Sequence, residues 1–193
     1  GDMTLDEAAQ ALQSKWSTGT QIQLRDGDRI WSVTPAQLGL TLDAAATVES
    51  ARNVGLAGMP FGYSVMPVVG MDTLTTQDFL LDLTEQTKIL PFNAGFRWEG
   101  DNLVGVLGSD GRYLDVAATL ASLQSNLSLV GASGNFNLSM TTLPPGARDP
   151  SAYLNQARTF TTQNFLINGY DPFTDEHFAW TTDRDTLTSW LEV

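Results

Sequence analysis

The sequence contains no cysteine and only one histidine, His177. The absence of cysteine excludes disulfide bonds, thiolate zinc sites and a cysteine nucleophile. His177 would have to be the base of any Ser-His-Asp triad, yet no serine of the chain stands in a Gly-x-Ser-x-Gly sequence. The glycines near Gly131 lack the lysine and the following helix of a phosphate-binding loop. We therefore expect no catalytic residue, no metal site and no cofactor.

Basic residues are also scarce, since 10 Lys and Arg stand against 22 Asp and Glu, and the formal net charge is −12. A surface this acidic repels the phosphate backbone of nucleic acids and the headgroups of anionic lipids, so we expect no nucleic acid as a partner. The chain also has no apolar run long enough to span a bilayer. We expect membrane association only through a segment outside this chain.

The sequence does contain a repeated phrase, in which LTLDAAATVESA begins at Leu40 and RYLDVAATLASL begins at Arg112. In each copy an aspartate, Asp43 or Asp115, stands where its carboxylate can accept the free N–H groups at the start of a helix. The small residues that follow favour helix, and the leucine before each aspartate can fix the chain to the core. The phrase therefore predicts a strand end, a helix cap and a helix start, used twice.

A β-hairpin is predicted before each copy, over residues 21–33 and again within residues 95–114. In both stretches polar and apolar residues alternate around glycine-containing turns. A capping box at Thr4 predicts a helix over about 5–16. A second capping box at Thr75 predicts a helix over about 75–90. Together these elements predict an α+β protein of two related hairpin-plus-helix units, with antiparallel strands packed on helices.

A stretch rich in proline, residues 144–150, is the best candidate for a domain boundary. Beyond it the spacing of Trp180, Asp183 and Leu187 repeats that of an earlier Trp-x-x-Thr-x-x-x-Leu segment, which begins at Trp31. We therefore expect one domain over residues 1–146, with half-units of about 5–70 and 71–146. Residues 147–193 would begin a second, truncated copy.

Acidic side chains form several close pairs along the chain, including Asp26 with Asp28 and Asp183 with Asp185. Glycosidase chemistry needs two carboxyl groups that face each other across a cleft, which leaves a carboxylate hydrolase open as one hypothesis. Residues 171–176 could supply oxygen ligands for calcium, but their spacing does not match an EF-hand loop. Turns and helix caps already account for these carboxylates.

The segment IWSVTPAQLGLTLDAAATVESARNVG, with the later VMPVV and GRYLDVAATLASL, resembles the peptidoglycan-binding domain of bacterial cell-wall proteins. That domain precedes VanW domains in exported VanW/YoaR-type proteins and the catalytic domain in some L,D-transpeptidases. The resemblance covers most of residues 5–143, and this sequence contains neither a VanW segment nor a transpeptidase His/Cys motif. It implies a non-catalytic, extracytoplasmic module at the cell wall or on the outer face of the membrane, with peptidoglycan as its partner.

Aromatic side chains with polar neighbours are the candidates for ligand contact, because aromatic faces pack on sugar rings. We expect Tyr63, Trp98 and Tyr113 to bind ligand, with Trp98 the most exposed of the tryptophans considered, whereas Trp31 is expected in the core. The acidic surface excludes nonspecific electrostatic attraction to anionic wall polymers. The alternative function is a structural spacer or protein-interaction module without glycan affinity.

Overall fold

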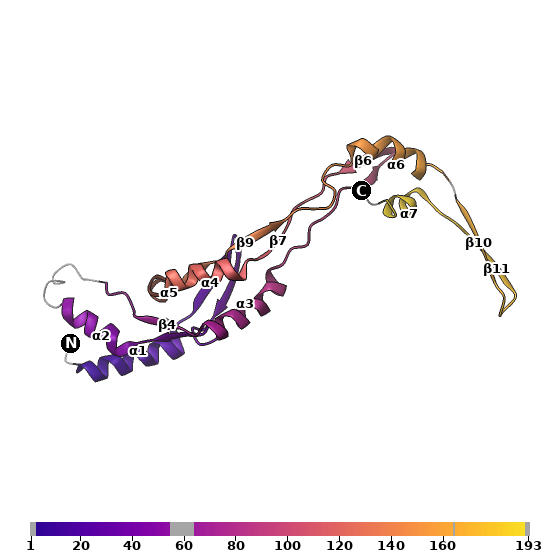
Figure 1. Ribbon diagram of the computed structural model, residues 1–193. Coiled ribbons are helices and arrows are strands. Elements are labelled where there is room, and N and C mark those ends of the chain that lie inside the picture. Colours follow the sequence, from indigo (N-terminus) through magenta and orange to yellow (C-terminus); the bar gives the residue numbers. More distant parts are fainter. Residues whose placement is uncertain (1–2, 55–63, 164, 192–193) are drawn as a thin grey trace. The chain divides into compact units, whose positions relative to one another are not determined.

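The computed structural model describes residues 3–54, 64–163 and 165–191, and spatial contacts divide the chain into two compact units (Figure 1). Unit 1 comprises Gly1–Lys88 and Tyr113–Thr141, and unit 2 comprises Ile89–Arg112 and Thr142–Val193. These units group residues by contact in space. The domain boundary predicted near residue 146, in contrast, separates copies that are related in sequence. That division stays a prediction.

The first half of unit 1 alternates helices and short strands: α1 (Leu5–Gly19), β1 (Ile22–Asp26), β2 (Arg29–Val33), β3 (Leu40–Leu42), α2 (Ala44–Val54), β4 (Val69–Met71) and α3 (Thr73–Thr87). The second half contains α4 (Val116–Ser125), α5 (Leu127–Ser133) and β8 (Asn135–Asn137). The strands β7 (Gly111–Leu114) and β9 (Met140–Leu143) each belong partly to unit 1 and partly to unit 2. None of the helices that the structure describes is long and apolar enough to cross a bilayer.

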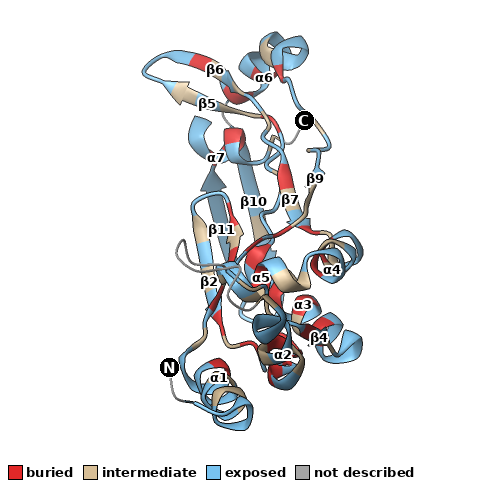
Figure 2. Ribbon diagram, turned by 90° about the vertical axis from the view of Figure 1, so that its left-hand side faces the viewer, coloured by how far each residue is buried: buried red, intermediate tan, exposed pale blue. Residues whose placement is uncertain are grey.

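The predicted α+β class is confirmed, and the strands of unit 1 form small sheets beside the helices. β1 pairs antiparallel with β2, and β3 pairs antiparallel with β4. The exception is β8, which pairs in parallel with the outer edge of β1. Fully buried side chains from the strands and helices, including Leu24, Leu38, Leu80 and Leu123, form the core between them (Figure 2).

Two hairpins have the same turn geometry because each places a glycine where a left-handed backbone is needed. Gly27 lies between the paired residues Asp26 and Arg29 with φ 59°, and Gly100 lies at the equivalent turn of β5–β6 with φ 61°. Glycine adopts this conformation without a steric penalty. The Asp-Gly and Glu-Gly sequences thus fix the register of both hairpins.

Unit 2 is smaller and consists of β5 (Gly95–Glu99), β6 (Asn102–Val106), the short 3-10 helix η2 (Ser151–Tyr153), α6 (Leu154–Thr161), β10 (Leu166–Asp171), β11 (Glu176–Thr181) and α7 (Arg184–Ser189). Its buried side chains come from β5–β6 and the two helices, and include Leu103, Ala157 and Leu187. Hairpin β10–β11 adds few buried residues to this core.

Helix α3 begins earlier than the sequence predicts. We expected a capping box at Thr75, but the cap is Asp72, whose side chain accepts hydrogen bonds from the Leu74 N–H and the Thr75 hydroxyl. The Thr75 hydroxyl therefore donates to the capping side chain and does not itself cap the helix. By contrast, the capping box between Thr4 and Glu7 is confirmed at the start of α1.

Candidate functional site

The structure describes two of the three residues predicted to contact ligand, and these two belong to different units. Trp98 lies on β5 in unit 2, and Tyr113 lies on β7 in unit 1 with 38% of its surface exposed. Tyr63 lies outside the described residues. Ligand contact by each of these residues stays a prediction.

Trp98 is half-buried and held by residues of α7. Its indole N–H donates a hydrogen bond to the Thr188 hydroxyl over 2.9 Å, and the Arg184 guanidinium lies 4.9 Å from the ring centroid. Both contacts stabilise the packing of hairpin β5–β6 on α7. The polar edge of the indole is therefore occupied within unit 2, which leaves less of Trp98 available to a ligand than we expected.

One of the grooves of unit 1 lies between β2 and α3. Its cavity volume is about 490 Å³, and it is lined by Ile30, Trp31, Ser32 and Val33 from β2 and by Phe79, Asp82, Leu83 and Gln86 from α3. We call it the β2–α3 groove. The four α3 residues follow the i, i+3, i+4, i+7 spacing of one helix face, so the helix presents them together.

The β2–α3 groove combines aromatic, aliphatic and polar side chains. Trp31 and Phe79 are half-buried and pack against the core, so their rings are held in place while part of each faces the solvent. Trp31 thus fulfils its predicted packing role and also lines a cavity. Asp82 and Gln86 are exposed and offer a carboxylate and an amide beside the rings. Such a surface can stack on a sugar ring and bond its substituents.

Arg29 fixes the β2 side of this groove. Its guanidinium lies 5.2 Å from the Trp31 ring centroid, pairs with Asp26, and donates to the Thr87 carbonyl oxygen over 2.7 Å. Asp26 is buried, so this ion pair accounts for one of the acidic pairs noted in the sequence. Because Thr87 ends α3, the three contacts hold hairpin β1–β2 against the end of that helix.

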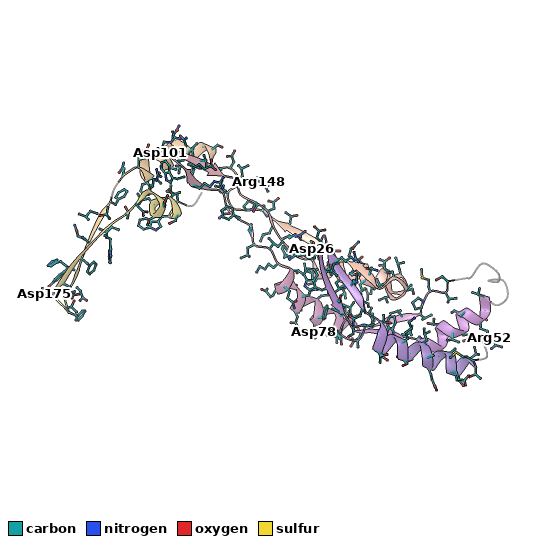
Figure 3. All side chains as sticks on the ribbon, turned by 180° about the vertical axis from the view of Figure 1, so that it is seen from behind. Asp26, Arg52, Asp78, Asp101, Arg148 and Asp175 are labelled. Atoms are coloured by element: carbon teal, nitrogen blue, oxygen red, sulfur yellow. The ribbon has the colours of Figure 1, made fainter. Side chains whose placement is uncertain are left out.

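Unit 2 contains a larger cleft beside α6, with a cavity volume of about 820 Å³. Gln156 and Phe160 line it from one face of α6. Tyr153 at the end of η2 and Gln163 just after α6 also line it, so the four residues have successive spacings of three, four and three. That spacing is visible in the sequence, but aromatic residues beside turns, the signal used to predict ligand contacts, do not include these four residues. The Arg148 guanidinium at this cleft, labelled in Figure 3, forms an ion pair with Asp110.

Asp149 is the one carboxylate among the residues that line the α6 cleft. The Ser151 hydroxyl and backbone N–H both donate to it and hold the pKa of the Asp149 carboxyl below its usual range. A carboxylate that stays ionised in this way cannot serve as a general acid near neutral pH. The β2–α3 groove likewise has one lining carboxylate, Asp82. Neither cavity therefore brings two lining carboxyls face to face, as glycoside hydrolysis requires.

Two acidic residues of hairpin β10–β11 and the histidine have local partners. Asp171 accepts from the Phe173 N–H, Asp175 accepts from the Tyr170 hydroxyl, and His177 stacks on the Tyr170 ring at 4.6 Å. Among the described residues, no group of three or more His, Asp or Glu side chains is placed to hold a metal ion. These residues of hairpin β10–β11 organise its turn.

Comparison with known proteins gives one match. A family model described as "Putative peptidoglycan binding domain" matches residues 31–129, just over half of the chain. The matched segment includes every residue of the β2–α3 groove except Ile30. No curated protein and no solved structure matches the chain.

Proposed function

Because the chain belongs to the family described as "Putative peptidoglycan binding domain", we propose that it is a non-catalytic, extracytoplasmic module that binds peptidoglycan through the β2–α3 groove. The observation that supports this site is its position: Trp31, Phe79, Asp82 and Gln86 all lie within the matched residues. The α6 cleft, in contrast, takes only Phe96 from the matched segment.

The groove suits an uncharged sugar ring beside a cationic group. The Trp31 and Phe79 rings supply apolar area, and the Gln86 amide can both donate to and accept from an N-acetyl group or hydroxyl. The Asp82 carboxylate can pair with a free amine of a stem peptide. With a net charge of −12, the chain cannot rely on general attraction to an anionic polymer, so recognition depends on these local contacts.

Resemblance to domains that precede VanW or L,D-transpeptidase domains supports a second part of the proposal. Wall binding by this module would hold a neighbouring catalytic or binding domain close to its substrate, which raises the effective concentration of that domain. The hypothesis of a spacer without glycan affinity differs from this in one respect. A spacer would not bind isolated wall material.

Co-sedimentation with purified, insoluble peptidoglycan tests the proposal. We expect the wild-type chain to pellet with the polymer and Phe79→Ala to remain largely in the supernatant, because the variant loses one aromatic wall of the groove. Trp98→Ala tests the predicted contact of Trp98 in the same assay. If the wild-type chain stays in the supernatant at all polymer concentrations, glycan binding is wrong and the spacer hypothesis stands.

A further inference from the structure

The β10–β11 hairpin carries an apolar face that is open to solvent. Ile167 and Trp180 are opposite each other in the pairing register, and they remain 42% and 59% exposed. Phe178 extends this face, with its ring 4.6 Å from the Trp180 ring. Figure 2 shows both strands as almost entirely exposed. Large apolar side chains gathered on one exposed face are typical of an interaction site.

This hairpin corresponds to β1–β2 in the order of elements. β10–β11 lies between α6 and the helix cap Asp183, just as β1–β2 lies between α1 and Thr34. Both Asp183 and Thr34 accept a hydrogen bond from the backbone N–H three residues later. Leu187 and Leu38, four residues after each of these, are fully buried. The two hairpins therefore stand in equivalent local frameworks.

The equivalent side chains have different environments. Counted back from the buried residue just before each helix cap, Trp180 occupies the same position as Trp31. Their partners in the pairing register, Ile167 and Leu24, are therefore equivalent as well. Leu24 is fully buried and Trp31 packs against the core of unit 1. The face that is covered in β1–β2 is thus the face that is open in β10–β11.

Part of the cover on β1–β2 is the parallel strand β8. The Gln23 N–H donates to the Gly134 carbonyl oxygen over 2.7 Å, and the Leu138 N–H donates to the Arg25 carbonyl oxygen over 2.8 Å. Phe136, at the centre of β8, is buried beside the hairpin. An uncharged Asn-Phe-Asn strand therefore satisfies the edge of β1 and adds an aromatic ring to the core.

The same edge of β10 is open. Within the part of the chain that the structure describes, β10 pairs with β11 alone. The Thr182 N–H donates to the Phe165 carbonyl oxygen, so these two residues form a hydrogen-bonded pair of the antiparallel ladder. Because bonded and non-bonded pairs alternate along such a ladder, the N–H and C=O groups of Leu166 and Asn168 point away from β11. These two residues correspond to the two residues of β1 that bond the segment around β8.

We propose that β10 is a strand acceptor: it binds an extended, uncharged segment in parallel along Leu166–Asn168, with an aromatic residue placed beside Ile167. The partner is a strand of the β8 type, polar–aromatic–polar and followed by leucine, supplied by a module in which that strand is not already paired with a hairpin of its own. The segment would satisfy the open edge and cover Ile167 and Trp180. The chain's own β8 is not this partner, because it is already paired with β1. Strand addition to an open sheet edge is a common mode of peptide recognition.

A tethered segment tests this proposal in the full chain. Residues 134–140 are appended to the C-terminus through a Gly/Ser linker of about 20 residues, whose root-mean-square reach is about 25 Å. Such a tether gives the segment an effective concentration in the millimolar range. We expect amide hydrogen exchange at Leu166 and Asn168 to slow at least about tenfold and the Trp180 environment to become less polar.

Two matched controls define the outcome. In the first control, the appended segment carries the equivalent of Phe136→Asp. In the second, the hairpin of the tethered chain carries Ile167→Lys. We expect the Leu166 and Asn168 amides of both controls to exchange as fast as those of the chain without the tether. Equal exchange in the tethered chain and these controls would overturn the proposal. Protection of Leu166 in the untethered chain that increases with protein concentration would also overturn it, because the partner would then be the hairpin of a second copy.

Discussion

Thr47 and Thr119, which stand 72 positions apart in the sequence, are buried side chains that make the same partly buried hydrogen bond. The Thr47 hydroxyl oxygen accepts from the Val68 N–H over 2.9 Å, and the Thr119 hydroxyl oxygen accepts from the Ser139 N–H over 3.1 Å. Each threonine lies four residues after a capping aspartate and ties the start of its helix to a later segment of the chain. The duplication is therefore present in the hydrogen bonds as well as in the sequence.

The two aspartates repeat this equivalence. The Asp43 N–H donates to the Val68 carbonyl oxygen and the Asp115 N–H donates to the Ser139 carbonyl oxygen, both over 2.8 Å. Each carboxylate also caps its helix by accepting from the N–H three residues later, over 2.8 Å and 2.9 Å respectively. A repeated unit of strand, cap, helix and returning segment thus builds unit 1 twice.

Removal of either threonine hydroxyl is expected to destabilise the fold. Thr47→Val and Thr119→Val keep the shape of the side chain but leave a partly buried backbone N–H without its partner, which costs about 1 kcal/mol. Urea unfolding followed by circular dichroism measures this loss. Thr18→Val, at an exposed position of α1, is the control and is expected to change stability by less than about 0.5 kcal/mol. Unequal losses at Thr47 and Thr119 would argue against equivalent roles.

Loss of a helix cap is expected to be equally symmetric. Asp43→Ala and Asp115→Ala each remove an acceptor for a free N–H at the helix start, at a cost of about 1 kcal/mol. Asp43→Asn and Asp115→Asn retain an acceptor oxygen and are expected to lose less. Unfolding curves of the four variants and the wild type give the free energies of unfolding to be compared. An alanine variant as stable as its asparagine counterpart would contradict the capping role.

Acid is expected to weaken the cap of α3. The Thr75 hydroxyl, together with backbone N–H groups, binds the Asp72 carboxylate and lowers its pKa in the folded state. Because the folded-state pKa lies below the unfolded-state value of about 3.9, the ionised carboxylate stabilises the fold fully at pH values above that unfolded-state pKa. This contribution is lost as the pH falls through the folded-state pKa. The difference in melting temperature between wild type and Asp72→Asn should therefore shrink from pH 6 to pH 2.5. Asp78→Asn, on the same helix but not at its cap, is the matched control, and a constant difference for Asp72→Asn would contradict the prediction.

Trp98 is expected to stabilise unit 2. Trp98→Phe removes the hydrogen bond to Thr188 and weakens the contact with Arg184, at a combined cost of about 1–2 kcal/mol. Hydrogen exchange of the β5 and β6 amides should accelerate accordingly. Thr188→Val removes the acceptor for Trp98 and the hydroxyl that donates to the Arg184 carbonyl oxygen, but it keeps the Trp98 ring and its contact with Arg184, and it should produce a smaller effect. Unchanged exchange in Trp98→Phe would show that these contacts do not hold the hairpin.

Local signals in the sequence were sufficient for the hairpins and most helix starts. Glycine at positions 27 and 100 specified the turns, and the aspartates at 43 and 115 specified the caps, because these effects act over three or four residues. The start of α3 was wrong because two acceptors, Asp72 and Thr75, compete within one turn, and the sequence does not show which one the backbone N–H groups face.

Long-range packing was beyond the sequence argument. The parallel pairing of β1 with β8 joins residues 112 positions apart, such as Gln23 and Asn135, and no local pattern encodes it. The β2–α3 groove depends on the same kind of information, because Trp31 and Phe79 line one cavity only after the hairpin packs on the helix. Trp31 was therefore predicted as core, and its part in a cavity was missed.

The most direct test of wall binding through the β2–α3 groove compares two charge-matched variants of one helix. Asp82 lines the groove, whereas Asp78, four residues earlier on α3 and labelled in Figure 3, is not among its lining residues. Binding isotherms with purified peptidoglycan should show at least about fivefold weaker binding for Asp82→Asn, which is about 1 kcal/mol, and wild-type binding for Asp78→Asn. Equal affinity of the two variants would contradict the assignment of this groove as the peptidoglycan site.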